Sequence, residues 1–428
     1  MCEATALFCK ALHSEQLRNI FHPPQRAWAG APVAPHYPFA QKRHTKPVGG
    51  RGISAFQMIF FFKKKDFRHI FSNGNRVKFL IRRRPASKKV QQNISDEFKK
   101  SMVYQVFDIS DFKHEEFEPL GTKAKYWCSD KQGNDYLFKS IETHDSRNNT
   151  ISRDGEDWSE KVACEIAKKL RIPCAQYELA YNKETRGVIT KSFITGANTY
   201  LVTANEILKN YSAPINNENV KKTEKQNIMH VYIILRRIIR NKPLSFKSRP
   251  SIKTAADFFT GYLMLDALLS NQDRHSENWG LIVTGKGRFH LAPTFDHAAG
   301  LGRNESDETK DKRLKSQDTG QQVSTYVRRA KSFFYLKESR LRTFKAFEYF
   351  GILNPRAALS WLEELDGLTE EIMRAIIDAV PTEIMSDVSK IFALEMLLCN
   401  KSNMMDLVSF FEENLDPSYR KRQIKTYE

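Results

Sequence analysis

The sequence lacks the features that mark several common protein classes. No run of about 18 uninterrupted apolar residues occurs, because the most apolar stretches, 55–62 and 258–265, end at Lys63 and Asp266. The six cysteines form no Cys-x-x-Cys pair, so neither a zinc site nor a disulfide framework is indicated. There is no internal repeat and no low-complexity tract. We therefore expect no transmembrane span and a chain that works in a reducing compartment.

Acidic residues are scarce in only one part of the chain. The 428 residues contain 68 Lys and Arg against 50 Asp and Glu, a net charge of +18. Residues 1–101 hold 20 basic and 5 acidic side chains, a net +15, and include basic runs at 63–65 and 82–84. The remaining residues, 102–428, are therefore nearly neutral, and the high average charge does not describe them.

Three interpretations of residues 1–101 are open, because no helical or strand period persists there and the order of a secretory signal is absent. The segment is a basic arm for nucleic acid or acidic lipid, a flexible extension without a role, or an upstream stretch included by an early start assignment. We favour the last two, since the basic runs lack interleaved aromatic residues. Met102 then becomes a candidate initiator, which the intact mass of the native protein would test.

The rest of the chain divides into a strand-rich and a helix-rich part. The composition, 41% hydrophobic and 11% aromatic, suffices for buried cores. Residues 102–195 read mainly as strands, beginning with the alternating 102–107, whereas 196–428 is dominated by helical periods. Those periods cover 228–239, 254–270, 356–363, 368–379 and 384–399. We predict an α+β fold with two lobes, a small β-rich lobe followed by a larger helical one.

One helix is expected in the β-rich part, after a polar loop that runs from 144 to 157. Asp157 can act as its N-cap, with Glu160 as the reciprocal residue of a capping box. The apolar positions of this helix repeat every four residues, at Trp158, Val162, Ile166 and Leu170. The pattern predicts an amphipathic helix that packs one face on the neighbouring strands.

The polar segment 271–278, Asn-Gln-Asp-Arg-His-Ser-Glu-Asn, carries the most chemical information. It follows a long apolar helix, and Asp273 and Asn278 have the Asp-x-x-x-x-Asn spacing of phosphotransferase catalytic loops. An aspartate there orients or deprotonates a hydroxyl, and a neutral amide oxygen binds a metal ion without adding negative charge. Arg274 and His275 are expected to be structural instead, pairing with nearby carboxylates to hold the loop.

Two further groups complete the predicted site. The stretches 279–283 and 289–292 read as strands joined by the turn at 285–287, a hairpin that returns the chain to Asp296, in position to bridge Mg²⁺ ions. Lys139 ends an earlier strand, 136–139, and is placed to hold phosphate. We expect a helix glutamate to fix its ammonium group, Glu160 in first place and Glu165 as the alternative.

These motifs resemble those of the HipA-like serine/threonine kinase family, and within it the short, CtkA-like branch. The resemblance covers about 102–428 and rests on motifs that occur in the family's order: 121–127 (GTKAKYW), 136–139 (YLFK), 158–160 (WSE), 271–278 (NQDRHSEN) and 293–297 (PTFDH). It implies the two-lobed fold of protein kinases and a kinase that uses ATP and Mg²⁺ to transfer the γ-phosphoryl group to Ser or Thr of a protein substrate. Autophosphorylation is a further expectation, because hydroxyl-bearing residues occur near the predicted phosphate loop and in 306–325. A bacterial cytoplasmic location is also implied; delivery into a host cell has no sequence signal.

The resemblance assigns roles position by position. Asp273 would be the catalytic base, and Asn278 and Asp296 the Mg²⁺ ligands. The segment 301–330 would occupy the place of an activation segment. The nucleotide-binding positions would be the phosphate-covering loop Gly121, Thr122, Lys123, Ala124 and Lys125, the ATP lysine Lys139 with its partner Glu160, the hinge Lys191, Ser192 and Phe193, and His275, Asn278 and Asp296.

Two departures from the family bear on partners and nucleotide binding. Full-length HipA toxins carry a further N-terminal subdomain that residues 1–101 do not resemble, which leaves open whether an antitoxin protein docks here. The phosphate loop has one glycine and two lysines, so we expect side-chain charge to offset weaker backbone cradling. Two other functions stay open: a phosphoinositide or small-molecule kinase, and a pseudokinase-type binding or effector module. The presence of Lys139, Asp273, Asn278 and Asp296 together argues against the pseudokinase.

Overall fold

A computed structural model describes residues 103–117, 125–144, 149–196, 198–212 and 225–427. The chain divides into two units, Met1–Gln91 and Gln92–Glu428, and all described residues belong to the second. The predicted extension 1–101 and the candidate initiator Met102 therefore lie outside the described residues. Within the described part of the chain, no helix is both long and apolar enough to cross a membrane.

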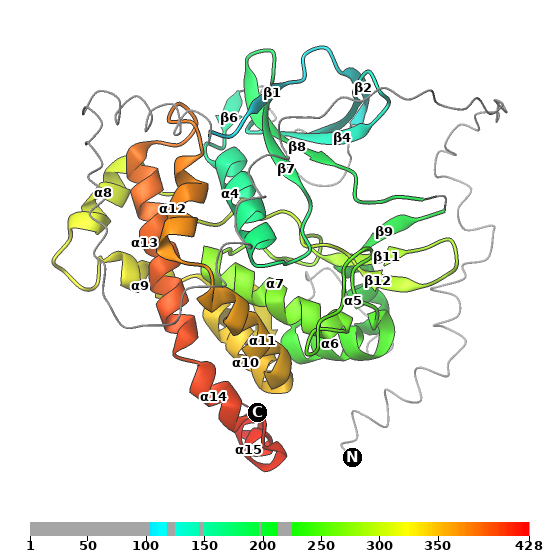
Figure 1. Cartoon of the computed structure of the whole chain (residues 1–428), viewed down its shortest axis with the longest axis vertical. Helices are drawn as coiled ribbons and strands as arrows, with labels where there is room; N and C mark the ends of the chain where they lie inside the picture. The colour runs from blue at the N-terminus through cyan, green and yellow to red at the C-terminus, as the bar shows by residue number, and fades with distance from the viewer. Residues whose placement is uncertain (1–102, 118–124, 145–148, 197, 213–224, 428) are drawn as a thin grey trace, which may run out of the picture. The chain divides into compact units, whose positions relative to one another are not determined.

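The N-terminal part of the described chain is a six-stranded sheet with one helix on it (Figure 1). Its strand order is β1, β7, β8, β4, β3, β2, in which β1 runs parallel to β7 and every other pair is antiparallel. The strands are β1 (Val106–Asp108), β2 (Lys113–Phe117), β3 (Lys125–Ser129), β4 (Asp135–Ser140), β7 (Tyr177–Asn182) and β8 (Thr185–Lys191). A two-stranded sheet joins β5 (Glu142–His144) and β6 (Thr150–Ser152).

Two sequence predictions in this region need correction. The alternating pattern predicted a strand over 102–107, but β1 begins only at Val106. The polar stretch 144–157 was expected to be loop, whereas β6 crosses it and pairs with β5. Both errors have the same cause, because a strand forms where a pairing partner is available and the sequence pattern does not show that partner. Here β1 pairs with β7, and β6 pairs with β5.

The helix on the sheet, α4, spans Glu156–Lys169. Its N-cap is Gly155, in the left-handed region at φ 85°, and no side chain caps the helix. The prediction of Asp157 as N-cap with Glu160 as capping-box partner is therefore wrong, because the helix starts earlier and leaves Glu160 in its interior. The predicted apolar stripe is confirmed: Trp158, Val162, Ile166 and Leu170 are all buried, and α4 packs against β7, β8 and α12.

A close approach between β4 and β8 sets the position of Lys139. Gly187 on β8 lies opposite Ser140 on β4. A Cβ atom at position 187 would lie 2.2 Å from the carbonyl oxygen of Lys139. Glycine is therefore required at this point, since any side chain would push β4 away from its neighbour.

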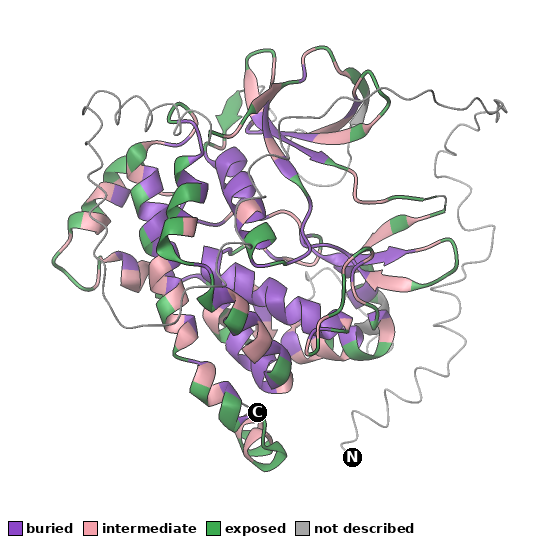
Figure 2. Ribbon diagram, viewed as in Figure 1, coloured by how far each residue is buried: buried purple, intermediate pink, exposed green. Residues whose placement is uncertain are grey.

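The C-terminal part is helical and is organised around α7 (Ala255–Leu269), which is buried along its whole length (Figure 2). Thr254 and Asp257 form a capping box at its start, and α10, α11 and α13 pack around it. The other helices are α5 (Ala204–Ser212), α6 (Ile228–Ile234), the π-helical η2 (Leu235–Ile239), α8 (Asp307–Lys315), α9 (Val323–Arg328), α10 (Thr343–Leu353), α11 (Pro355–Asp366), α12 (Glu370–Asp378), α13 (Asp387–Met405), α14 (Val408–Glu413) and α15 (Pro417–Tyr427).

Two three-stranded sheets accompany these helices. One joins β9 (Tyr200–Thr203), β11 (Gly280–Val283) and β12 (Phe289–Leu291) in the order β12, β11, β9. The β11–β12 pair is the hairpin predicted from the sequence. The other sheet joins β10 (Gln226–Asn227), β13 (Lys331–Leu336) and β14 (Ser339–Arg342). The α+β architecture, with strands first and helices afterwards, is as predicted.

Candidate active site

The loop after α7 is held in place by a buried ion pair. Arg274 lies at 1% exposure and binds Asp266 of α7 through both Nε and Nη2, the latter at 2.7 Å from Oδ1. Asn271 Nδ2 donates to the same carboxylate at 2.8 Å, and Arg274 Nη1 donates to the carbonyl oxygen of Asn278 at 3.1 Å. The structural role predicted for Arg274 is confirmed. This clamp reaches Asn278 through its backbone carbonyl and does not use the amide side chain of that residue.

Asp273 and Asn278 lie side by side at the edge of this loop. Asn278 is buried, and its Nδ2 donates to the carbonyl oxygen of Asp273 at 2.7 Å. That hydrogen bond orients the Asn278 amide, because the amide nitrogen binds the Asp273 carbonyl and the amide oxygen points away from it. The Asp273 side chain is 39% exposed, as an acid or base that must reach a bound hydroxyl has to be.

The β11–β12 hairpin returns the chain to the second carboxylate, Asp296. Asp296 has a left-handed backbone, φ 59°, a conformation that Asp tolerates better than most residues. Its backbone N–H donates to Tyr177 Oη at 3.3 Å. The preceding Thr294 forms a bridge with Cys174 in front of β7, so the loop that presents Asp296 is anchored to the N-terminal part of the molecule.

Lys139 is the centre of the charged cluster. Its Nζ lies 3.0 Å from Glu160 Oε1, 3.5 Å from Asp296 Oδ1 and 3.1 Å from Tyr177 Oη. The predicted pair with Glu160 is thus present, while the alternative Glu165 binds Lys161 and Lys168 instead. Four segments that are distant in sequence, β4, α4, β7 and the loop after β12, meet at one ammonium group.

The electrostatics keep this cluster charged. Burial alone would lower the pKa of Lys139, but the carboxylates of Asp296 and Glu160 outweigh it and hold that pKa well above its ordinary value. Burial would likewise raise the pKa of Glu160, yet Lys139 and His297 keep it below its ordinary value. Burial raises the pKa of Tyr177, so its hydroxyl stays neutral. The site therefore presents a fixed cation at neutral pH.

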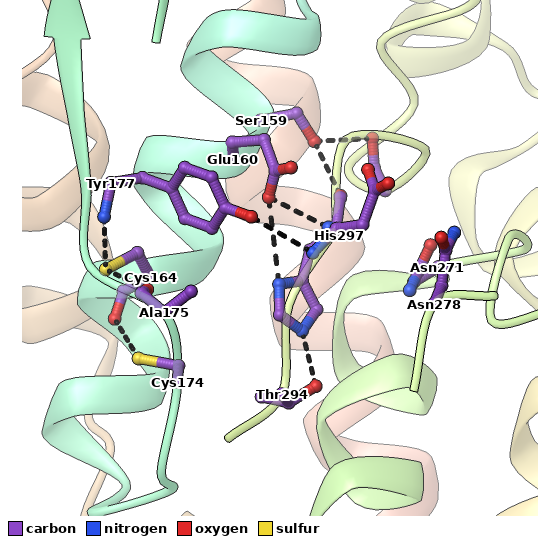
Figure 3. Close-up of polar contacts among 12 residues, drawn as sticks. Ser159, Glu160, Cys164, Cys174, Ala175, Tyr177, Asn271, Asn278, Thr294 and His297 are labelled. Atoms are coloured by element: carbon purple, nitrogen blue, oxygen red, sulfur yellow. Dashed lines mark hydrogen bonds and ion pairs between the residues drawn. The ribbon is translucent and has the colours of Figure 1, made fainter. Parts of the chain in front are cut away.

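A second set of contacts ties α4 to the loop that carries Asp296 (Figure 3). Glu160 Oε2 accepts a hydrogen bond from the backbone N–H of His297 at 2.8 Å. Ser159 Oγ lies 3.2 Å from the carbonyl oxygen of Gly300, to which it donates. His297 is fully buried and its Nε2 meets Thr294 Oγ1 at 2.9 Å. The helix and the carboxylate loop are thus joined by residues whose side chains do not face the open site.

A cavity of about 450 Å³ opens between the two parts of the molecule beside this cluster. Its walls combine apolar groups, among them Leu137, Leu201 and Phe193, with the charged residues described above. Phe193 also packs against Phe295, with ring centroids 5.9 Å apart. The predicted residues that line it are Lys125, Lys139, Lys191, Ser192, Phe193, Asp273, His275, Asn278 and Asp296.

Of the predicted residues that the structure describes, Glu160 does not line the cavity. Glu160 lies behind Lys139 at 1% exposure and touches the site through the ion pair. Gly121, Thr122, Lys123 and Ala124, the rest of the predicted phosphate loop, lie outside the described residues. Lys125, predicted as loop, is the first residue of β3 and pairs in register with Lys139. The two lysines therefore sit next to each other on adjacent strands.

Sequence analysis did not find Tyr177 or Arg153, although both line the cavity. Tyr177 holds Lys139 and the Asp296 backbone at once. Its position in an alternating strand made it look like a core residue, which it also is, at 1% exposure. Arg153 follows the short strand β6 in a segment expected to be loop, and only the pairing of β6 with β5 brings it to the cavity.

Comparison with known proteins identifies the family. A family model described as HipA-like C-terminal domain matches residues 113–384, more than half of the chain. The chain belongs to this family. The resemblance found in the sequence motifs is thereby confirmed. Among curated proteins, none matches the sequence.

Two solved structures are similar to the chain. The Helicobacter pylori proinflammatory kinase CtkA is similar at a TM-score of 0.55 and 20% sequence identity, over 72% of this chain and 99% of that chain. HipA in the Shewanella oneidensis MR-1 toxin–antitoxin complex with HipB and operator DNA gives a TM-score of 0.43 and 11% identity, over 78% and 73%. The likeness to CtkA shows that the HipA-like chain has a protein-kinase-like α+β fold, as predicted.

Proposed function

We propose that the chain is a protein serine/threonine kinase that uses ATP and Mg²⁺. The observation that carries the proposal is the convergence of Lys139, Asp273, Asn278 and Asp296 on one cavity from three separate stretches of the chain. A buried lysine, an exposed carboxylate and two oxygen ligands are the groups that phosphoryl transfer requires, because its catalysis consists of positioning and charge stabilisation.

The residues present fit both implied ligands. A cavity of about 450 Å³ with apolar walls and a few polar groups is within the range of small-ligand sites. The apolar walls suit a base, and the adjacent cations Lys125 and Lys139 suit phosphates. The Asp296 carboxylate and the Asn278 amide oxygen are hard ligands of the kind that Mg²⁺ prefers. Bound Mg²⁺ would supply positive charge to the transferring phosphoryl group.

Each residue of the chain then has a defined task. Lys139 holds a permanent charge in a fixed position, because Glu160 and Tyr177 restrain its ammonium group. Asp273 receives the proton of the acceptor hydroxyl and orients that hydroxyl for attack. Asn278 and Asp296 hold the metal on the cavity side of the loop. Phosphate binding would also draw on Lys125.

The decisive experiment is transfer of ³²P from labelled ATP to the protein itself, to a cell lysate and to lipid vesicles. We expect labelling of protein by the wild type and loss of it in Asp273→Ala and Asp296→Ala. Asp111→Ala is the matched control, since Asp111 is exposed and lies outside the cavity. No incorporation by the wild type would refute the kinase, and labelling of lipid alone would favour the phosphoinositide kinase.

Two finer proposals accompany this one. Autophosphorylation is expected at hydroxyl residues in 306–325 or near the phosphate loop, and phosphopeptide mapping after incubation with ATP would test it; a map without sites in these segments would contradict it.

The solved HipA of Shewanella oneidensis is bound to HipB. A protein partner of that kind stays a prediction here, testable by purification of the tagged chain from its native source.

A further inference from the structure

The β13–β14 hairpin lies directly beside the catalytic loop. The backbone N–H of Lys331, the first residue of β13, donates to Gln272 Oε1 at 3.1 Å, and Gln272 precedes Asp273. Phe333 of the same strand packs edge-on against His275, with ring centroids 5.6 Å apart. His275 also lines the cavity. The hairpin is therefore the surface next to the place where an acceptor hydroxyl would approach Asp273.

This hairpin is firmly anchored. Phe334 is fully buried and packs against Phe259 of α7. Ser332 Oγ donates across the hairpin to the carbonyl oxygen of Leu341 at 3.0 Å. On the outer face, the Arg340 guanidinium stacks on Phe333 at 4.5 Å from the ring centroid. A rigid surface of this kind can select a ligand without first having to become ordered.

The outer surface of the hairpin and its flanks carries a strong positive charge. Between residues 328 and 345 the only acidic residue is Glu338, and it is paired with Lys225. All basic side chains of the segment are exposed: Arg328, Arg329, Lys331, Lys337, Arg340, Arg342 and Lys345. This local excess contrasts with the near neutrality of the chain beyond residue 101.

One pair in this surface works against the stability of the hairpin. Lys331 and Arg342 are direct cross-strand partners in the antiparallel register. Like charges in that position repel each other and destabilise a hairpin. A negatively charged group bound between them would remove the repulsion, so the arrangement is one that favours an anionic ligand.

We propose that the β13–β14 hairpin docks acidic residues that flank the acceptor Ser or Thr of a protein substrate. The inference rests on the proposed kinase activity and specifies its substrate class. An extended acceptor segment rises roughly 3.3 Å per residue, so a segment lying along the hairpin would bring Asp or Glu within a few positions of the acceptor to Lys331 and Arg342. Charge complementarity would both steer the substrate and fix its register.

The test is a set of three peptides that share one Ser and differ in its flanks, which are acidic, neutral or basic. We expect kcat/KM to be highest for the acidic peptide, by about fivefold for each exposed ion pair formed, and this advantage to shrink in high salt. Equal kcat/KM for all three peptides, or a preference for the basic one, would overturn the docking proposal and leave the kinase standing. Phosphorylation of none of the peptides or other proteins would refute both.

Arg342→Glu separates docking from folding. The substitution places opposite charges on the facing positions 331 and 342, so we expect its unfolding midpoint to equal or exceed that of the wild type. The ratio of kcat/KM for the acidic peptide to that for the neutral one should nevertheless fall by about tenfold, since one attraction becomes a repulsion. Lys331→Glu with Arg342→Glu should lower the ratio further.

Lys286→Glu with Arg288→Glu is the matched control, because both cations are exposed in the turn between β11 and β12. It should leave the ratio of the two kcat/KM values as in the wild type. The same proteins are titrated with a labelled single-stranded RNA and a DNA duplex. Nucleic-acid binding that Arg342→Glu abolishes, together with an unchanged peptide ratio, would overturn the proposal in favour of a nucleic-acid surface.

Discussion

The cavity and the β13–β14 hairpin handle charge in opposite ways. In the cavity Lys139 is buried and already paired with two carboxylates, at 3.0 and 3.5 Å. On the hairpin the cations are exposed, and Lys331 faces Arg342. A buried charge must be neutralised within the protein because its desolvation is costly, whereas water and salt compensate an exposed one. The cation in the first region is therefore held by ion pairs within the protein, and the cations proposed to bind a ligand in the second region are exposed to water.

The comparison also separates positioning from attraction. The cavity charges are fixed by several contacts each, so their arrangement precedes any ligand. The hairpin charges have flexible ends on a rigid base, and their effect extends over about a Debye length, roughly 8 Å at physiological salt. Substitutions in the cavity should therefore lower catalysis by large factors, with or without a loss of stability. Substitutions on the hairpin should change the choice of substrate.

The largest effect is expected from Asp273→Asn. Removal of the group that accepts the hydroxyl proton should lower kcat by roughly 10²- to 10⁴-fold, while the unfolding midpoint stays within about 2 °C of the wild type because Asp273 is partly exposed. Steady-state kinetics and thermal denaturation check the two halves. Asp111→Asn serves as the control, and a drop in kcat there of similar size would show that the comparison is wrong.

Lys139→Met should have the largest effect on stability. It leaves Glu160 and Asp296 without their buried partner, which should cost about 3–5 kcal/mol of unfolding free energy. Arg342→Met, which removes an exposed cation, should change that free energy by less than about 0.5 kcal/mol. Urea denaturation of both variants measures the difference, and equal values would remove the distinction between the two regions.

The pH dependence of stability gives a smaller effect with a defined direction. The pKa of Glu160 is depressed, so the stability that its ionised form contributes is present above the ordinary value of about 4.3 and is lost as the pH falls through the native pKa. The pKa of Lys139 is raised, so its contribution is present below about 10.4 and is lost as the pH rises through the native value.

Between these limits the ion pair should contribute a constant amount. Melting curves from pH 3 to 7 should show a steeper loss of stability in acid for the wild type than for Glu160→Gln. Parallel curves for the two proteins would mean that the native pKa of Glu160 is not lowered. The hairpin variant Arg342→Met should follow the shape of the wild-type curve, because it removes an exposed side chain that stays charged over this pH range and adds no titratable group.

Tyr177→Phe should have the smallest effect. It deletes the acceptor of two hydrogen bonds, from Lys139 Nζ and from the Asp296 backbone, and the cost should be about 1 kcal/mol, or roughly fivefold in KM for ATP. Tyr126→Phe is a matched control, since Tyr126 also loses a hydrogen bond, with Asn182, but lies outside the cavity. An unchanged KM in Tyr177→Phe would show that Glu160 alone suffices to position the lysine.

Local patterns predicted those parts of the site that lie within one loop or hairpin. The spacing of Asp273 and Asn278 places both on one loop, and the turn at 285–287 indicated the hairpin that leads to Asp296. The partner of Lys139 needed more. Glu160 was the first choice for this partner, although a capping box also seemed to account for it. The start of α4 at Glu156 removes the capping box and leaves Glu160 in the helix interior, where it binds the lysine.

Contacts between distant segments had no local pattern at all. Tyr177 meets Lys139 because β7 and β4 flank β8 in the sheet, an order that alternation in single strands does not determine. The β13–β14 hairpin was not predicted either. Its sequence contains two adjacent phenylalanines, and their separation into a buried Phe334 and a partly exposed Phe333 becomes visible only when the strand is paired.

The left-handed backbone at Asp296 limits how this chain can change over evolution. Asn and Gly accept the same conformation, and most other residues do so only with strain. Asn and Gly are also residues that carry no charge. A single replacement at this position would therefore remove the carboxylate proposed to hold Mg²⁺ while preserving the shape of the loop and its ties to α4, which gives a direct mutational path from the proposed kinase to a folded but inactive scaffold.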